Sequence, residues 1–447
     1  MSRHSLRQIA LFWSVNVARL VLAATFIFSG FVKAADPMGM FHKLGAYFAH
    51  WGYTFPLDSV VLRGMVVCLA VVEFVLGLHF LLGMRMRLTA WCSSLFMLAM
   101  TLLTIYIYRY EPVADCGCFG DAYVLSNGAT LAKNVVLLLL CGLCLFAGRY
   151  TKRFISERNQ WLTSIYTWVY VLGLCLYTLH YVPILEFTDY RNGTHWRDAW
   201  EGRFSADAPE SLSTLCFTDA RTGDDVTEQI LDSGYCFLLT MPEISTADAG
   251  NNDRINDIYD ECVDNGYRFF LAVGEPWQKE DLQHWMDQTG AAYPVVSADA
   301  VQLKAMVRSN PGLLLLRDGI QIRKWSNNDL PILNDALAQQ TYRNSIRGII
   351  GLPNDNGDWR AQPETPRYFW KRPLGQLVLW YIIPLLAIMA LDNIWVGSKY
   401  YRRYTQRRRL RRQQNAQPLS GQEEDQPEHA PSENKPENKI HHTNYQP

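Results

Sequence analysis

The sequence has almost no net charge, since 42 lysine and arginine residues face 43 aspartate and glutamate residues. Nucleic-acid-binding proteins usually carry a clear basic excess, so the composition gives no indication of a nucleic-acid partner. Cysteine is also scarce in the long polar region 184–373. Of the ten cysteines, only Cys216, Cys236 and Cys262 fall there. This odd and sparse set excludes a disulfide-stapled scaffold.

The first apolar stretch lacks the features of a removable signal peptide. It is longer than the apolar core of such a peptide, and no small-residue cleavage site separates it from a mature domain. We therefore expect this stretch to be retained as a membrane-spanning helix.

Six apolar stretches are each long enough to cross a bilayer core of roughly 30 Å, which requires about 20 residues. They are residues 8–32, 59–84, 88–108, 129–148, 161–183 and 374–397. We expect a polytopic α-helical membrane protein with five parts. These are a four-span membrane domain at 1–150, a fifth span at 151–183, an outer domain at 184–373, a sixth span at 374–397, and a basic juxtamembrane segment with a disordered tail at 398–447.

Basic residues flank alternate ends of these spans. They are Arg3, Arg7, Arg85, Arg87, Arg149, Lys152, Arg153, Arg158 and the arginine run from Arg402 to Arg412. The connections 33–58 and 109–128 are poor in basic residues, and the first is an aromatic-rich loop suited to a membrane interface. The positive-inside rule therefore predicts a bacterial inner-membrane protein with both termini cytoplasmic and residues 184–373 periplasmic.

Strand-like and helix-like segments alternate within the polar region. Strands are expected at 235–241, 269–273, 293–296, 313–316 and 320–325, and helices at about 247–265, 277–289 and 298–308. Asp318-Gly319 is a hairpin-turn signal, and 211–233 suggests another hairpin. This order predicts a small α/β domain with a mixed sheet.

The connection between the third and fourth spans contains Asp115-Cys116-Gly117-Cys118-Phe119-Gly120-Asp121. Two thiols outside the membrane can exchange with disulfides, and the small ring closed by Cys116 and Cys118 would be strained and labile. Gly117 supplies the backbone freedom that this ring needs. The alternative is a structural turn with inert or bridged cysteines. Two thiolates without a nearby histidine are too few for a tetrahedral metal site, so none is predicted.

Ionisable residues also fall within the spans. Arg19 lies near the middle of the first span and Glu73 near the middle of the second, and His79 follows on the same helix as Glu73. Charges at bilayer depth usually pair or face a polar cavity. We expect Arg19 and Glu73 to meet as an ion pair. The cluster is either a site for a proton or a quinone headgroup, or a packing contact between the first two spans.

Several of these residues resemble a known group of membrane proteins. They are Arg19, Gly30-Phe31-Val32-Lys33, Asp36-Pro37, Glu73, Gly77, Gly83 and Arg87. Residues 8–150 are similar in these positions to the four-helix DoxX-like proteins, and the Cys-Gly-Cys-Phe-Gly loop resembles that of their MauE (methylamine utilisation) branch. The resemblance implies action with a thioredoxin-like partner in maturing the disulfides of a periplasmic enzyme.

The segment from Val307 to Gly319 is similar to the thioredoxin segment that runs from the cis-proline into the last hairpin. It predicts a cis bond between Asn310 and Pro311 in a partner-binding loop. Where thioredoxins place Cys-x-x-Cys, this chain has Met241-Pro242-Glu243-Ile244-Ser245-Thr246, without cysteine. The whole chain therefore resembles fusions of a DoxX-type bundle with a degenerate thioredoxin-like domain, as in gut Bacteroidetes.

These observations support two hypotheses of different class. In the first, Cys116 and Cys118 are the catalytic pair of a thiol-redox accessory protein that exchanges electrons with a periplasmic thiol or disulfide protein, with a lipid quinone as a candidate cofactor. In the second, the protein is a non-enzymatic scaffold in the lipid bilayer that anchors a binding domain.

Overall fold

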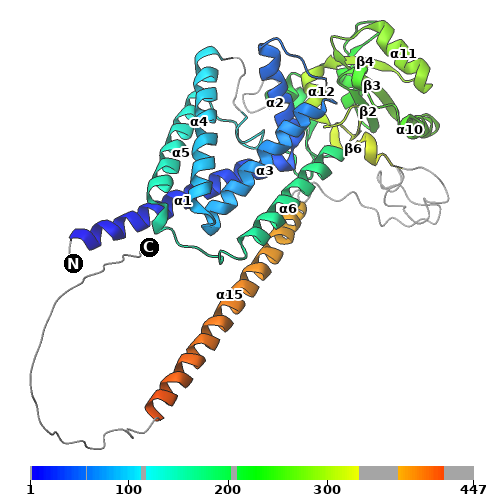
Figure 1. Ribbon diagram of the computed structural model, residues 1–447. Helices are drawn as coiled ribbons and strands as arrows, with labels where there is room; N and C mark the ends of the chain where they lie inside the picture. Colours follow the sequence, from blue (N-terminus) through cyan, green and yellow to red (C-terminus); the bar gives the residue numbers. More distant parts are fainter. Residues whose placement is uncertain (1–2, 57, 112–116, 203–208, 332–370, 417–447) are drawn as a thin grey trace, which may run out of the picture. The chain divides into compact units, whose positions relative to one another are not determined.

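The computed structural model describes residues 3–56, 58–111, 117–202, 209–331 and 371–416. The chain forms two compact units, Met1–Asn393 and Ile394–Pro447. Within the described residues, six helices are long and apolar enough to cross a membrane, which confirms the predicted spans. They are α1 (Arg3–Ala35), α3 (Val60–Leu82), α4 (Met86–Tyr110), α5 (Asn127–Ala147), α6 (Gln160–His180) and α15 (Lys371–Ala416), shown in Figure 1. A short 3-10 helix, η1 (Gly148–Tyr150), follows α5.

The connection between the first two spans is a helix, not the loop that the sequence suggested. Helix α2 (Pro37–His50) begins at Asp36, whose carboxylate accepts a hydrogen bond from the backbone N–H of Gly39 at 3.0 Å. Asp36 is thus the N-cap, and Pro37 occupies the first turn, where a missing N–H has no cost. The Asp-Pro pair therefore starts a new helix directly after α1 ends.

Helices α1 and α3 pack backbone against backbone. A Cβ atom added at Gly30 would lie 2.5 Å from the backbone nitrogen of Phe74, and one added at Gly77 would lie 2.6 Å from that of Ile27. Only glycine permits this approach, as is common between membrane helices. The two contacts also show that the helices run antiparallel. This register determines which polar residues of α1 and α3 can meet.

The described residues of the polar region form a mixed sheet, as predicted, with six strands. Its strands are β1 (Thr218–Asp219), β2 (Tyr235–Met241), β3 (Arg268–Glu275), β4 (Val295–Asp299), β5 (Gly312–Arg317) and β6 (Ile320–Ser326), in the spatial order β1-β4-β3-β2-β5-β6. Strands β2, β3 and β4 are parallel to one another, whereas β5 pairs antiparallel with both β2 and β6. The bond between Asn310 and Pro311 is cis, which confirms that prediction.

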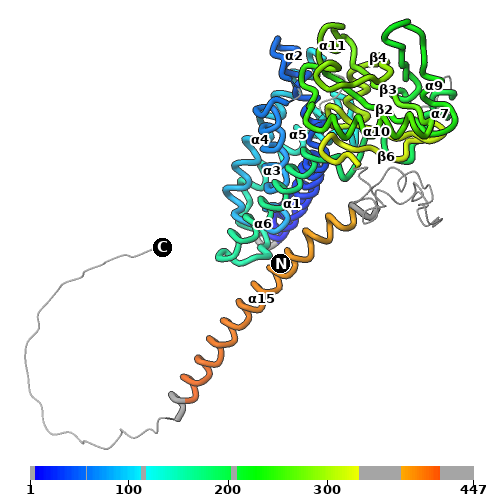
Figure 2. The backbone as a smooth tube through the Cα atoms, turned by 90° about the vertical axis from the view of Figure 1, so that its right-hand side faces the viewer, coloured from blue at the N-terminus to red at the C-terminus, as the bar shows by residue number. Residues whose placement is uncertain are grey.

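Figure 2 traces the backbone of the strands and of the helices around them. Side chains of β2 alternate between two hydrophobic cores, one on each face of the sheet. Phe237 and Leu239 pack with α10 (Asn252–Asp264) and α11 (Lys279–Thr289), whereas Cys236 and Leu238 pack with α7 (Trp196–Glu201), α9 (Thr227–Leu231) and α12 (Ala300–Met306). A strand buried on both faces reads as a continuous apolar run, which is why β2 was recognisable in the sequence.

The predicted hairpin at 211–233 is present in reduced form, as a turn closed by a single antiparallel bridge between Thr218 and Asp225. Asp219 and Asp224 close the turn through a backbone hydrogen bond of 2.8 Å, but β1 has two residues and pairs with β4. The short helices α8 (Glu210–Ser213) and α9 flank it. Residues 332–370 of the predicted outer domain and the tail beyond Ala416 lie outside the described residues.

Candidate functional site

A buried ion pair joins α1 to α3 where the two glycine contacts bring the helices together. Lys33 Nζ lies 2.8 Å from Glu73 Oε2, and the two side chains are 1% and 4% exposed. The ammonium group also donates to Ser29 Oγ at 2.8 Å and to the backbone carbonyl of Cys118 at 2.6 Å. All three ammonium hydrogens therefore have an acceptor, as a charge buried among helices requires.

The Cys118 carbonyl accepts a second bond from the same helix, because Ser29 Oγ also donates to it at 2.6 Å. Ser29 and Lys33, which donate to this carbonyl, and Glu73, which pairs with Lys33, are together called the inner anchor. Hydrogen bonds from a charged donor are about twice as strong as neutral ones. The segment 115–121 is called the cysteine loop. Its backbone at Cys118 is thus fixed directly to the buried ion pair of the helical bundle.

The same loop is held a second time, three residues further along, by a side chain of the sheet domain. Arg308 Nη2 lies 2.7 Å from Asp121 Oδ2 and 2.9 Å from Asp36 Oδ2. Lys43 of α2 lies 3.1 Å from Asp121 Oδ1 and donates to the carbonyl of Gly120 at 3.2 Å. Arg308, Asp36, Asp121 and Lys43 are called the outer anchor. It joins the sheet domain, α2 and the cysteine loop.

The electrostatics of the outer anchor favour its charged state. Burial of Asp121 favours the neutral acid, but Arg308 and Lys43 outweigh it and hold the pKa of this carboxyl below its ordinary value. Burial would likewise lower the pKa of Arg308, yet Asp36 and Asp121 raise it above its ordinary value. Two cations and two carboxylates therefore form a neutral, mostly buried cluster.

Of the two predicted catalytic cysteines, only Cys118 lies within the described residues; Cys116 does not. Cys118 is partly buried and packs against Tyr47 and Ile107. Gly117 and Gly120 both have positive φ angles, 66° and 56°. A Cβ at Gly117 would lie 2.6 Å from the side chain of Lys43, so glycine is required there for both reasons.

The predicted ion pair between Arg19 and Glu73 is wrong. Arg19 donates to the carbonyl of Lys152 at 2.6 Å and lies over the Phe154 ring, and Glu73 pairs with Lys33 instead. Arg19 precedes Lys33 by fourteen residues, which is about 21 Å along a helix. In the antiparallel packing this places Arg19 beside Gly83, at the far end of α3.

His79 is also separate from the inner anchor. Its Nε2 atom lies 2.9 Å from Ser164 Oγ on α6, and its Nδ1 atom lies 3.4 Å from Thr89 Oγ1 on α4. The three residues predicted as one buried polar cluster are therefore distributed over two levels of the bundle. Lys33, which completes the inner anchor, was part of a recognised motif but was not assigned a partner.

A small cavity lies beside the inner anchor, with a volume of about 30 Å³. Its lining includes Glu73, Cys118, Lys133 and Asn134. This volume suits a single water molecule, whereas organic ligands occupy pockets of about 300 Å³ or more. The cavity therefore does not fit a quinone ring, although the polar groups around it could bind water.

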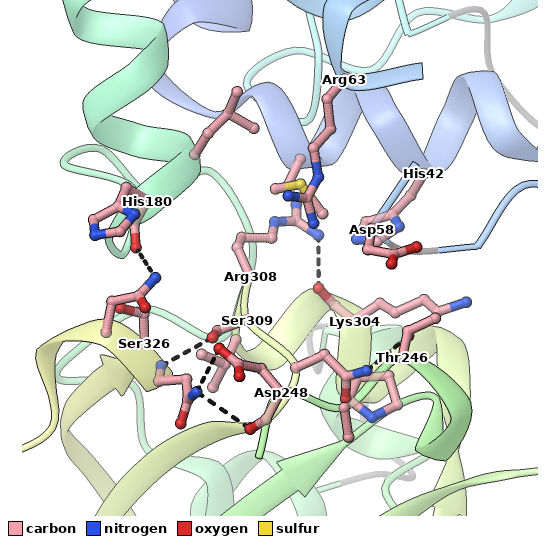
Figure 3. A pocket seen from close by; sticks show the side chains of 18 of the residues that line it. His42, Asp58, Arg63, His180, Thr246, Asp248, Lys304, Arg308, Ser309 and Ser326 are labelled. Carbon is pink, nitrogen blue, oxygen red and sulfur yellow. Dashed lines mark hydrogen bonds between the residues drawn. The ribbon is translucent and has the colours of Figure 1, made fainter. Parts of the chain in front are cut away.

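A larger cavity of about 470 Å³ is lined in part by Arg308 of the outer anchor (Figure 3). Residues of α2, α3 and α6, including His42, Arg63 and His180, face the sheet-domain loops that carry Asp248 and Asn310. The Asn310 side chain donates to the Glu243 carbonyl at 2.6 Å, so the loop of Asn310 and Pro311 contacts the segment 241–246. This segment contains the 3-10 helix η2 (Ile244–Thr246), and a further 3-10 helix, η3 (Asn327–Asp329), follows β6. None of the described residues that line this cavity is a cysteine.

His42 of α2 lines the larger cavity. Burial, together with the positive charges of Arg308 and Lys304, lowers its pKa well below the usual 6.5. The imidazole is therefore neutral at pH 7. A proton on it would add a further positive charge next to the outer anchor.

Comparison with known proteins identifies one part of the chain. Residues 11–147 match the family model of the methylamine utilisation protein MauE. This segment contains the complete inner anchor, the cysteine loop, and three of the four residues of the outer anchor. Neither the curated proteins nor the solved structures gave a match. The matched segment is therefore similar to MauE, and the sheet domain lies outside it.

Proposed function

We propose that this protein is an inner-membrane accessory protein for thiol–disulfide exchange outside the cytoplasm, with Cys116 and Cys118 as its redox pair. The observation that carries the proposal is the inner anchor. A buried lysine–glutamate pair, costly in a membrane, has its ammonium group bonded to the backbone carbonyl of Cys118. The MauE match of residues 11–147 supports an accessory role for this domain.

The chemistry follows from ordinary thiol–disulfide exchange. One loop thiolate attacks a disulfide of the partner protein, forming a mixed disulfide and releasing one partner thiolate, which takes up a proton. The second loop cysteine then loses its proton and attacks the mixed disulfide. The loop leaves as a Cys116–Cys118 disulfide, and the partner leaves as a dithiol. Two electrons pass to the partner, and the reverse sequence restores the loop dithiol.

In this proposal the sheet domain binds and positions the partner protein and takes no part in electron transfer. Its parallel strands β2 to β4, its terminal β5-β6 hairpin and the cis bond at Pro311 support a thioredoxin-like arrangement. The position of a thioredoxin Cys-x-x-Cys is occupied by Met241 to Thr246, without cysteine. The redox partner is then a separate thiol or disulfide protein.

The proposal requires the loop and the sheet domain to lie outside the cytoplasm, as the basic flanks of the spans predict. Alkaline phosphatase fused after Asn251 should be active, and the same enzyme fused after Gln414 should be inactive. The opposite pattern would remove both the topology and the redox function.

The second candidate function is a non-enzymatic scaffold. The observation that favours it is the 470 Å³ cavity, which is polar, borders the loop of Asn310 and Pro311, and has no cysteine among its described lining residues. On this reading the two anchors only hold the domains together, and the cysteine loop is a structural turn.

Serine substitutions separate the two functions. Cys116→Ser and Cys118→Ser should each abolish restoration of envelope disulfide status in a deletion strain, and should do so equally because one thiol cannot close the ring. Both variants should reach the membrane in normal amounts. Cys216→Ser, at an exposed cysteine of the sheet domain, is the matched control and should behave as wild type. Full activity of the loop variants would leave the scaffold function.

A further inference from the structure

We infer that Arg308 is a positioning residue through which the sheet domain controls the exposure of Cys118. The inference rests on the proposed redox function of the loop and adds a regulatory role for the sheet domain within the same chain. It depends on three features of Arg308: how rigidly it is presented, what it contacts, and how near those contacts are to the thiol.

Arg308 is presented on a well-connected turn between α12 and β5. Its Nη1 atom donates to the carbonyl of Lys304 at 2.8 Å. The following residue, Ser309, donates to the carbonyl of Pro311 at 2.7 Å and accepts from the backbone N–H of Asn327 at 3.0 Å. The side chain is 6% exposed. A guanidinium held in this way has little freedom to follow a moving loop, so it acts as a fixed point.

Arg308 offsets the electrostatic repulsion between the carboxylates of Asp36 and Asp121. Asp36 and Asp121 both approach Nη2, so their carboxylates lie close together. Without Arg308, Lys43 would be the one described cation within salt-bridge distance of Asp121. Two nearby carboxylates repel each other when no cation lies between them. Because Asp36 is fixed as the N-cap of α2, Asp121 would be the group that moves.

Asp121 is close in sequence to the thiol, and the turn between them is tight. The backbone N–H of Gly120 donates to the carbonyl of Gly117 at 2.9 Å, and that of Ala122 donates to the carbonyl of Phe119 at 3.3 Å. Movement of Asp121 would therefore pull on residues 117–120. The inner anchor would still hold the Cys118 carbonyl, but the side chain would lose its packing against Tyr47 and Ile107.

The experiment measures how fast a maleimide alkylates Cys118 in the full-length protein in membranes, read at this residue by peptide mass spectrometry. A Cys116→Ser background keeps the loop from closing a disulfide. Arg308→Gln should raise the rate about tenfold, since local opening sets the reactivity of a packed group. Arg308→Lys keeps the positive charge but loses the planar guanidinium that binds both carboxylates, and should give a smaller rise in the alkylation rate.

Lys324→Met is the structural control. Lys324 is another buried cation of the sheet domain. It lies 3.0 Å from Glu186 and donates to the carbonyls of Tyr190 and Met306, none of which belongs to the cysteine loop. It should leave the Cys118 rate within about twofold of the parent. An unchanged rate in Arg308→Gln, or an equal rise in Lys324→Met, would overturn the inference.

This outcome is independent of the proposed redox function, because alkylation needs no partner protein. If Arg308→Gln exposes Cys118 while the serine variants retain full activity in cells, the positioning role stands and the redox function fails. If the serine variants are inactive and the Arg308→Gln rate is unchanged, the redox function stands and the positioning role fails.

Discussion

The inner and outer anchors hold the same short loop by different means. The inner anchor is one ammonium with three acceptors inside the helical bundle, and all of its residues lie in the segment that matches MauE. The outer anchor is a guanidinium between two carboxylates, and Arg308 comes from outside that segment. The helical bundle is thus able to fix Cys118 alone, and the sheet domain adds a second constraint.

The comparison predicts the largest effects at the inner anchor. Lys33→Met or Glu73→Leu alone leaves an unpaired charge at membrane depth and should lower the free energy of unfolding by about 3–5 kcal/mol. The double variant should recover much of this loss. The free energies of unfolding of the parent, the two single variants and the double variant are measured on purified protein in detergent. Additive losses would show that the two side chains do not depend on each other.

The outer anchor should give a smaller loss, because Asp121 is 25% exposed and water can replace part of its contacts. Asp121→Asn should lower the free energy of unfolding by about 1–3 kcal/mol. Combined with Arg308→Gln, it should cost less than the two single losses together. Asp318→Asn, at an exposed turn residue, is the control and should change little. A loss at Asp121 as large as that at Lys33 would contradict the ranking of the anchors.

The stability of the protein should also depend on pH through His42, whose pKa the nearby Arg308 of the outer anchor helps to lower. Because the folded-state pKa of His42 lies well below 6.5, the unfolded chain binds the extra proton first as the pH falls. Stability should therefore fall below about pH 6.5, by up to about 1.4 kcal/mol per pH unit. His42→Gln should flatten this dependence between pH 7 and 5, whereas His284→Gln, at an exposed site, should not. The pKa of Asp121 is lowered, so its contribution persists through this range and is lost only below the ordinary carboxyl pKa.

The smallest coupling is expected between Arg19 and Glu73. Each contacts a different level of the bundle, so the losses in Arg19→Leu and Glu73→Leu should add to within about 0.5 kcal/mol. Recovery of stability in the double variant would mean that the two side chains meet after all, which would contradict the antiparallel register of α1 and α3.

Some features of the fold were predictable because they depend on local sequence. The spans follow from apolar length, and the strands from apolar runs bounded by turn residues. The partner of Glu73 could not be predicted from local sequence, because it depends on how α1 and α3 pack. The sequence contains Gly30 and Gly77 at the helix contact, and antiparallel packing about them brings Lys33, not Arg19, to Glu73. That deduction requires the glycines to be recognised as the contact point before the charges are paired.

The outer anchor was beyond reach from the sequence for a related reason. Arg308 and Asp36 are separated by 272 positions and belong to different folding patterns, a sheet loop and a helix N-cap. Nothing local distinguishes Arg308 from a solvated arginine. Likewise, Asp36-Pro37 was recognised as a motif, but its role as the start of α2 became clear only from the cap geometry.

Trapping the redox state of Cys116 and Cys118 in living cells shows whether these two thiols form the proposed reversible redox pair. Cells are quenched in acid, free thiols are blocked, disulfides are reduced, and the released thiols are labelled with a maleimide polymer. The account predicts a fraction of the protein that gains two labels after reduction, a fraction that changes when the envelope oxidant is removed, and no gain in the Cys116→Ser/Cys118→Ser variant. If reduction releases no thiols from Cys116 and Cys118, or if their labelling is the same under oxidising and reducing growth, the loop is not a redox pair.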